Sequence, residues 1–443
     1  MDELDLAKRI LSKYPLCSNC LGRLFASLGY GLSNRDRGVA IKTLLLMKAY
    51  NVATGSVDVE TVLLLTKSGF EPAIKLLRNK KLEGYESLKA EKCYICEDLL
   101  ESSEFLKAVV GKILDKVKEY EFESFLVGTH VDAEILEREE RIVSEFGIPF
   151  SESIKKEINR ELGKKLQEAI GRDVNYRNPD LTILVHFPQG EFSLDVKPLF
   201  IYGRYRKLMR GLSQSAGRLH VKANVKAKPS VEEFIGRPLL KLTEAEMVRL
   251  HGAGREDVDV LMLGNGRPFV AEVVKPKKRN IELERVKEMI REYSKGAIEV
   301  EDLRFTDRKT IAKLKALSQH TTKLYRAVVT FENEVAESQL NLVEEVFRNK
   351  VIKQRTPLRV LRRRADKVRS KIVYEVKARK LSNGKVEFLI KCQGGLYVKE
   401  LITGDEGRTK PSIAEVLENK PIEIVLDVLY IEEFGEDIVP RGC

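Results

Sequence analysis

The chain has 443 residues, which is enough for two or three domains that each bury a hydrophobic core. Hydrophobic residues make up 43% and charged residues 33%, and the apolar runs fall far short of a membrane span, so the composition excludes an integral membrane protein and indicates a soluble globular one. Lys and Arg number 78 against 67 Asp and Glu, and the net charge of +11 favours a polyanionic partner, nucleic acid first, with a merely basic surface as the alternative.

Four of the six cysteines form two CxxC pairs in the first hundred residues. The acidic N-terminus lacks the basic region of a signal peptide, so a cytoplasmic location is expected, and there paired cysteines favour zinc over disulfides. Two pairs complete a tetrahedral structural zinc site with no open position for catalysis. The zinc would clamp the two ends of a helical insertion. The expected ligands are Cys17, Cys20, Cys93 and Cys96.

Periodicity in the first two hundred residues changes from helical to mixed. Apolar residues at helical spacing predict helices, and alternating apolar residues predict strands. From residue 104 to about 199 the pattern indicates a small basic domain of α+β type. The predicted helices span 37–50, 57–67, 72–80, 105–120, 133–146 and 154–170, and the predicted strands span 121–130, 181–187 and 192–196.

The stretch YGRYRKLMR at 202–210 interleaves tyrosines with basic residues. Guanidinium groups bind phosphates and tyrosine rings stack on bases, so RNA binding through Arg204, Tyr205 and Arg206 is one interpretation. A basic linker whose tyrosines belong to the core is the alternative.

Three acids, Glu256, Asp257 and Asp259, follow a Gly-Arg pair. A strand-like run at 258–263, the turn residues Gly264-Asn265-Gly266 and a second run at 269–274 predict a hairpin. Acids flanked by glycine before a buried strand suggest a carboxylate at a cleft edge. Solvated acids at a polar turn are the alternative.

The rest of the chain alternates helices and strands without a nucleotide-binding fingerprint. A second hairpin is predicted around Asn383-Gly384. The predicted helices span 282–293, 308–318 and 337–348, and the predicted strands span 324–331, 370–380, 385–392 and 422–431.

An arginine-rich stretch, QRTPLRVLRRRADKVR, occupies residues 354–369. A solvated surface helix rarely needs so much arginine, so phosphate binding is favoured. The expected RNA contacts here are Arg355, Arg359, Arg363 and Arg364.

Carboxylates are the remaining candidates for chemistry, because the five histidines show no metal-ligand spacing and no Ser-His-Asp or Cys-His arrangement is suggested. One interpretation is a metal-dependent nuclease built on Asp257 or Asp259 with Glu272 and Lys275. The Glu-x-x-Lys spacing places the last two on opposite faces of a strand, which counts against it. The other interpretation is cofactor-free chemistry at one aspartate.

Three motifs carry a family resemblance. Gly254-Arg255-Glu256-Asp257 resembles the Gly-Arg-x-Asp element of pseudouridine synthases, KLYRA at 323–327 resembles their tyrosine motif, and GGLYVKEL at 394–401 resembles their third motif. Together with the N-terminal CxxC, NPDLTILV, YGRYRKLMR, HGAGREDVDV and QRTPLRVLRRRAD, they are similar to the Pus-ten family of archaeal and eukaryotic tRNA pseudouridine synthases. The likeness runs from Cys17 to the end, with Arg362 where His is expected.

The resemblance implies an α+β protein in two parts. A zinc-containing accessory domain would span 1–199, with a THUMP-type RNA-binding part at about 70–198, and a mixed α/β catalytic domain with a central antiparallel sheet would span 200–443. The implied partner is tRNA, held at its T-arm and elbow, with uridine 54, and 55 as well, as the target in tRNA convention. No organic cofactor and no membrane are expected, and the chain is expected to be a monomer.

The resemblance also implies roles for single residues. Asp257 would be the essential carboxylate, acting as nucleophile or as base at the sugar, and Lys399 the cation that keeps it ionised. Tyr325 would stack on the flipped uracil and help remove the C5 proton, and Leu401 would wall the pocket.

Arg255 and Tyr397 are further expected substrate contacts. Core positions for Tyr325 and Leu401 and a solvated Lys399 are the alternatives for single residues. For the whole chain, an RNA-binding module with an inactive catalytic domain and the metal-dependent nuclease both stay open.

Overall fold

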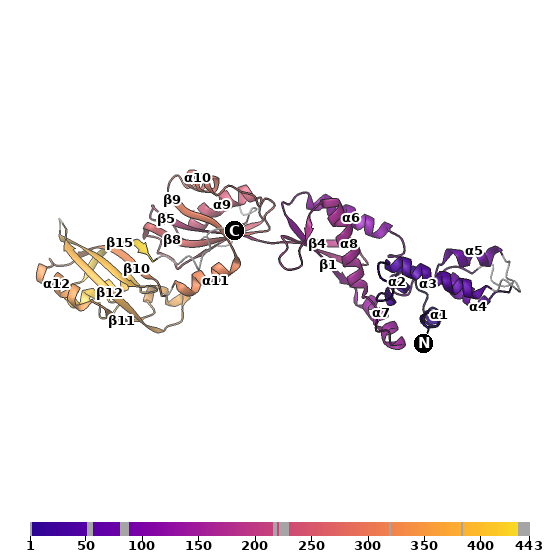
Figure 1. Ribbon diagram of the computed structural model, residues 1–443. Coiled ribbons are helices and arrows are strands. Elements are labelled where there is room, and N and C mark those ends of the chain that lie inside the picture. The colour runs from indigo at the N-terminus through magenta and orange to yellow at the C-terminus, as the bar shows by residue number, and fades with distance from the viewer. Residues whose placement is uncertain are drawn as a thin grey trace. The chain divides into compact units, whose positions relative to one another are not determined.

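The computed structural model describes residues 2–50, 56–79, 88–215, 219–220, 230–318, 320–381 and 384–432. The chain divides into two compact units, Met1–Val196 and Lys197–Cys443 (Figure 1). Each unit has a hydrophobic core of its own. Among the described helices, none combines the length and the apolar character that crossing a membrane requires.

The first unit begins with five helices whose starts follow local capping rules. The side chains of Asp2, Ser33 and Asp58 accept hydrogen bonds from the first turns of three of them. Two of the helices cross closely because they meet at glycines: a Cβ on Gly22 or Gly38 would lie 1.8 Å from a backbone oxygen of the other helix. The helices are α1 (Glu3–Lys13), α2 (Ser18–Leu24), α3 (Asn34–Ala49), α4 (Val59–Lys67) and α5 (Glu71–Asn79).

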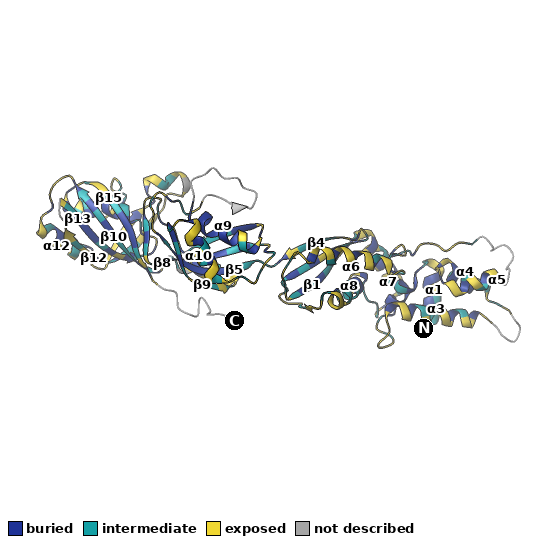
Figure 2. Cartoon of the chain, turned by 90° about the horizontal axis from the view of Figure 1, so that it is seen from above, coloured by how far each residue is buried: buried dark blue, intermediate teal, exposed yellow. Residues whose placement is uncertain are grey.

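The rest of the first unit is a four-stranded sheet with three helices. The strand order is β2-β1-β3-β4, with β1 parallel to β3 and β3 antiparallel to β4. Alternate residues of β3 are buried, as the apolar alternation predicts. Figure 2 shows buried and exposed residues on the strands and helices of this unit. This confirms the predicted α+β character. The elements are α6 (Glu104–Val117), β1 (Ser124–Val131), α7 (Ala133–Phe146), α8 (Ile154–Ile170), β2 (Asp173–Val174), β3 (Leu181–Phe187) and β4 (Glu191–Val196).

The second unit is built on a large sheet, which has 11 strands within the described residues. Its main path runs β14-β11-β12-β13-β10-β15-β8-β5-β9, and all neighbouring pairs are antiparallel except β15 and β8. The predicted central antiparallel sheet is therefore confirmed. The strands are β5 (Leu199–Lys207), β6 (Leu219–His220), β7 (Met247–Gly252), β8 (Leu261–Val274), β9 (Ile298–Thr306), β10 (Thr322–Phe331), β11 (Lys350–Arg355), β12 (Val368–Lys380), β13 (Lys385–Gln393), β14 (Thr409–Lys410) and β15 (Pro421–Ile431).

Helices connect these strands and pack on the sheet. Buried residues of α9, α10 and α12 join the same core as the inner faces of the strands. The helices are α9 (Val231–Thr243), α10 (Leu283–Tyr293), α11 (Arg308–Leu317), α12 (Glu337–Val346), α13 (Val398–Thr403) and α14 (Ile413–Leu417), with a 3₁₀ helix, η1, at Leu358–Arg363.

The hairpin predicted around Gly264-Asn265-Gly266 is wrong, because β8 runs through these residues as one strand. Both glycines have positive φ, 56° and 71°, and a Cβ on Gly264 would lie 1.7 Å from the carbonyl oxygen of Leu429 on β15. The glycines therefore let β8 pass close to its neighbours, and they do not turn the chain. The second predicted hairpin is confirmed by the β12–β13 pairing, although the turn residue Asn383 lies outside the described residues.

Candidate active site

Several segments that are far apart in the sequence line one cavity of about 590 Å³ in the second unit. The loop between β7 and β8 contributes Asp257, strand β10 contributes Lys323 and Tyr325, and the start of α13 contributes Lys399. The 3₁₀ helix η1 adds Arg359. The three resemblance motifs are thus brought together in space.

Asp257 is held mainly by an arginine. Its Oδ1 lies 3.0 Å from Nη1 of Arg359, while its Oδ2 lies 3.8 Å from Nζ of Lys399. Arg359 is oriented in turn by Glu400, because its Nε lies 2.6 Å from Glu400 Oε1. Burial alone would lower the pKa of Arg359, but Glu400 and Asp257 raise it above the usual value, so this cation stays charged.

Lys399 lies closer to a second carboxylate than to Asp257. Its Nζ is 2.7 Å from Asp259 Oδ2. Burial would raise the pKa of Asp259, but the hydrogen bond and charge of Lys399 outweigh it and hold this pKa below its usual range. Lys399 is therefore a cation shared by two aspartates, and Arg359 is the nearer partner of Asp257.

Tyr325 lies on β10 between Ile390 of β13 and Val428 of β15, and it lines the cavity. Burial raises its pKa, and the nearby Cys392 raises it further. The phenol is therefore protonated at neutral pH. A protonated ring can stack on a base and donate a hydrogen bond.

A network of buried charges supports the loop that carries Asp257. Arg267 Nε lies 2.7 Å from Oε2 of Glu256, and the hydroxyl of Tyr205 lies 3.0 Å from both oxygens of that carboxylate. Lys207 donates to the backbone oxygen of Asp257 at 3.0 Å. Strand β5 thus positions the Asp257 loop through Tyr205 and Lys207.

Two RNA contacts predicted in the stretch 202–210 are wrong, because the side chains are buried. Tyr205 is fully buried, and Arg204 donates to the carbonyl oxygens of Gly266 and Ile431 at 2.9 and 3.1 Å. Arg206 pairs with Glu299 at 2.9 Å. The basic-aromatic pattern here serves the core, which was the alternative interpretation.

The other predicted site residues differ in their position relative to the cavity. Arg255, Arg364 and Tyr397 line the cavity, and Arg364 donates to the Tyr397 hydroxyl at 3.0 Å. Arg355 pairs with Asp366 at 2.7 Å.

Leu401 is fully buried in the core, and the predicted pocket wall is formed instead by apolar residues such as Leu396 and Val398. The side chain of Arg363 lies outside the described residues.

The cavity is strongly cationic. Two carboxylates, Glu256 and Asp257, face eight basic side chains in its lining. Such an excess suits a phosphate backbone. The basic side chains are Arg255, Arg267, Lys323, Arg359, Arg364, Arg369, Lys371 and Lys399.

The residues of the nuclease interpretation do not join Asp257. Glu272 lies 2.9 Å from His251 and 3.6 Å from Arg249, and Lys275 pairs with Glu246 at 2.9 Å. Across the described parts of the chain, the one cluster with metal-binding spacing consists of cysteines. The carboxylates therefore lack the arrangement that a metal-dependent nuclease needs.

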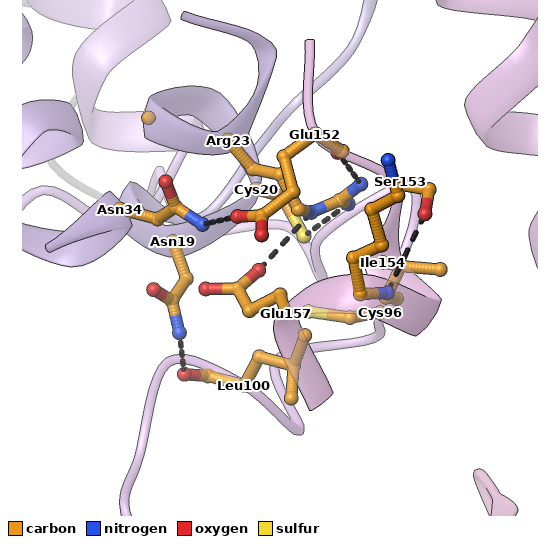
Figure 3. A network of polar contacts seen from close by, with 12 residues as sticks. Asn19, Cys20, Arg23, Asn34, Cys96, Leu100, Glu152, Ser153, Ile154 and Glu157 are labelled. Atoms are coloured by element: carbon orange, nitrogen blue, oxygen red, sulfur yellow. Dashed lines mark hydrogen bonds and ion pairs between the residues drawn. The ribbon is translucent and has the colours of Figure 1, made fainter. Parts of the chain in front are cut away.

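The four predicted zinc ligands come together in the first unit. The Sγ atoms of Cys17, Cys20, Cys93 and Cys96 all lie within 4.8 Å of one another, and the side chains are buried. Tetrahedral zinc with Zn–S bonds of about 2.3 Å places sulfurs about 3.8 Å apart, so the cluster fits zinc. Arg23 lies beside it, with Nη2 3.5 Å from Cys20 Sγ (Figure 3).

Comparison with known proteins decides the family. The family "Pus10, C-terminal" matches residues 200–432, and "Pus10 THUMP domain, archaeal" matches residues 109–186. The chain belongs to the Pus10 family. A relative from Thermofilum pendens, named tRNA pseudouridine synthase Pus10, is 48% identical over 97% of this chain and 96% of its own length. One from Ignisphaera aggregans with the same name is 38% identical over 98% and 100%.

The resemblance that the motifs predicted is thereby confirmed, together with the enzyme class, an isomerase. Among solved structures, a Cbf5-Nop10-Gar1 complex is 14% identical with a TM-score of 0.27, covering 51% of this chain and 57% of that one. The assignment to the Pus10 family does not depend on it.

Two features of this Pus10 site could not be predicted. Arg359 was expected to bind RNA, and the structure places it on Asp257. Lys323 belongs to the tyrosine motif, yet nothing in the motif indicates that its ammonium group lines the cavity. Both properties depend on how strands distant in sequence pair, which local periodicity does not report.

Proposed function

We propose that this Pus10 protein isomerises uridine to pseudouridine in tRNA at the cavity around Asp257. Family membership supports the reaction, and the names of the relatives support tRNA as the substrate. The observation that carries the proposal is the convergence of Asp257, Tyr325 and two cations, Arg359 and Lys399, in one basic cavity.

The reaction needs no electrons and no added group. The N1–C1′ bond breaks, the uracil turns, a C5–C1′ bond forms, the C5 proton leaves and N1 gains a proton. Asp257 would act on the sugar, as nucleophile at C1′ or as base, with Arg359 and Lys399 orienting its carboxylate.

Tyr325 would stack on the flipped uracil. Its raised pKa favours this role over that of a base, because a protonated phenol cannot accept the C5 proton. Another group or water would take the proton.

We propose the T-arm uridines, 54 and also 55 in tRNA convention, as the targets, with the T-arm and elbow as the bound surface. A test uses unmodified tRNA transcripts in which each uridine is replaced singly by cytidine, followed by carbodiimide labelling of pseudouridine and primer extension. Stops at the retained T-arm uridine are expected. Stops elsewhere would overturn the target assignment, and no stop on any transcript would overturn the proposed function.

We propose the region 1–199 as the accessory domain, with structural zinc on the four cysteines, and 200–443 as the catalytic domain. The THUMP match supports RNA binding by the first region. Arg255, Arg364 and Tyr397 would contact the substrate, since they line the cavity. The protein would act as a monomer in the cytoplasm without an organic cofactor, and light scattering after gel filtration tests its mass in solution.

A further inference from the structure

Lys323 is a buried cation whose ammonium group faces the cavity. The residue is 6% exposed, and it lines the cavity together with Tyr325, two residues further along β10. A Cβ on Gly254 would lie 3.4 Å from its Nζ, so the absence of a side chain at Gly254 leaves room beside the ammonium. Lys323 thus lines the cavity next to Tyr325, the residue proposed to stack on the flipped base.

Unlike the ammonium groups of the other buried lysines, that of Lys323 has no hydrogen-bond or ion-pair partner within the described residues. Lys42 donates to the carbonyl oxygens of Leu16 and Ser68 at 2.8 and 2.9 Å. Lys207 donates to three carbonyl oxygens. No hydrogen bond or ion pair joins Nζ of Lys323 to any residue in the described ranges.

The charged groups around Lys323 do not compensate it. Arg267 and Lys371 repel the ammonium, and Glu256 is bound to Arg267. Burial raises the pKa of Cys392 to about 12, so this thiol is neutral, and the phenol of Tyr325 is neutral as well. Burial, together with Arg267, lowers the pKa of Lys323 to about 7. An uncompensated buried cation is costly, which is typical of a functional site.

The proposed reaction produces a negatively charged uracil, which can pair with the ammonium group of Lys323. When the N1–C1′ bond breaks, its electron pair stays on uracil N1 and spreads onto the two carbonyl oxygens. The pair at C5 then forms the new bond to C1′, the C5 proton leaves, and N1 is protonated. A donor in a dry site is most effective where charge develops in this way.

We propose that Lys323 is a catalytic residue that donates a charged hydrogen bond to a carbonyl oxygen of the target uracil and stabilises the uracil anion during the isomerisation. The role rests on the proposed function at Asp257. The ammonium form is the active one, so the second-order rate constant falls as pH rises through the pKa of the free enzyme.

The test measures tritium release from tRNA labelled at C5 of uridine, between about pH 5 and 9, at limiting and saturating enzyme. Lys323→Met is expected to lower the rate at saturating enzyme about 10²- to 10³-fold with little change in tRNA affinity. In this variant the second-order rate constant should no longer fall as the pH rises. Lys323→Arg keeps its charge, so the fall moves to higher pH. The matched control Lys391→Met, an exposed lysine on neighbouring β13, is expected to behave as wild type.

Each result separates the two claims. A Lys323→Met enzyme with the wild-type rate and pH profile would overturn the role of Lys323 and leave the proposed function standing. Should Lys323→Met fail to fold, an unchanged alkaline limb in Lys323→Arg would overturn the role equally. Failure of wild type and control to release tritium would overturn the proposed function and this role with it.

Discussion

Arg23 in the first unit and Lys323 in the second are both buried cations, and their surroundings are opposite. Arg23 pairs with Glu139. It also pairs with Glu157 at 3.1 Å and donates to Cys20 Sγ at 3.5 Å (Figure 3). Lys323 has repelling neighbours and an open cavity in front of it. A compensated buried charge fixes helices to one another, whereas an uncompensated one stays available for a ligand.

The same contrast separates the two chemical sites. The cysteine cluster is closed, with four buried ligands and Arg23 beside it. The cavity around Asp257 is open and carries an excess of positive charge.

Removing the proposed zinc should have the largest effect. Structural zinc contributes on the order of 10 kcal/mol in small domains, so Cys20→Ala or treatment with a chelator is expected to unfold the helical part of the first unit. Circular dichroism and protein-bound zinc check this, with zinc added back as the control. Unchanged helicity in a metal-free preparation would contradict the structural role.

Lys323→Met should stabilise the protein, which is the reverse of most core substitutions. Unfolded lysine has a pKa of 10.5, and burial with Arg267 nearby lowers that of folded Lys323 to about 7, so between these values the unfolded chain binds more protons. The gain is therefore greatest below pH 7, at up to about 5 kcal/mol, and fades toward pH 10.5. Denaturant titrations at several pH values measure it. A loss of stability at pH 6 would mean that Lys323 has a structural partner.

Arg23→Met should destabilise the first unit by about 3 to 5 kcal/mol, because Glu139 and Glu157 would remain buried without a counter-ion. The free energy of unfolding in urea measures the loss. Lys116→Met removes an exposed cation from the same unit and serves as the control, with a change within about 0.5 kcal/mol. Equal effects of the two changes would show that the buried ion pairs of Arg23 contribute no more to the free energy of unfolding than an exposed cation does.

Tyr205→Phe should have the smallest effect. Its hydroxyl bonds Glu256 and Gln214, so the loss is expected to be about 1 kcal/mol of stability, with the affinity for tRNA unchanged. Thermal denaturation and filter binding measure the two quantities. Weaker tRNA binding at unchanged stability would restore the interpretation of Tyr205 as an RNA contact.

The sequence could predict the parts of the site that lie within continuous motifs. Asp257, Tyr325 and Lys399 were each identified in a motif, and the structure places all three in one cavity. The four cysteines could also be predicted as metal ligands, because the spacing of two CxxC pairs is typical of a zinc site. Most helices and strands followed from periodicity, because it reports which face of an element is buried.

What the sequence could not predict depends on contacts between distant elements. Basic residues look alike whether they bind phosphate or a buried backbone, so Arg204 was misread as an RNA contact, and the bond from Arg359 to Asp257 was missed. The glycines at 264 and 266 have the composition of a turn, yet each is required by the close approach of another strand, Leu429 of β15 at Gly264 and Tyr205 of β5 at Gly266.

The most direct test of the account is release of tritium from C5 of uridine in unmodified tRNA, in buffer without magnesium, by wild type, Asp257→Asn and the control Asp115→Asn. Asp115 is exposed and lies in the first unit. The account predicts release by wild type and control, and a rate at least about 10³-fold lower for Asp257→Asn. Equal release by Asp257→Asn, or RNA cleavage that appears only when magnesium is restored, would contradict it.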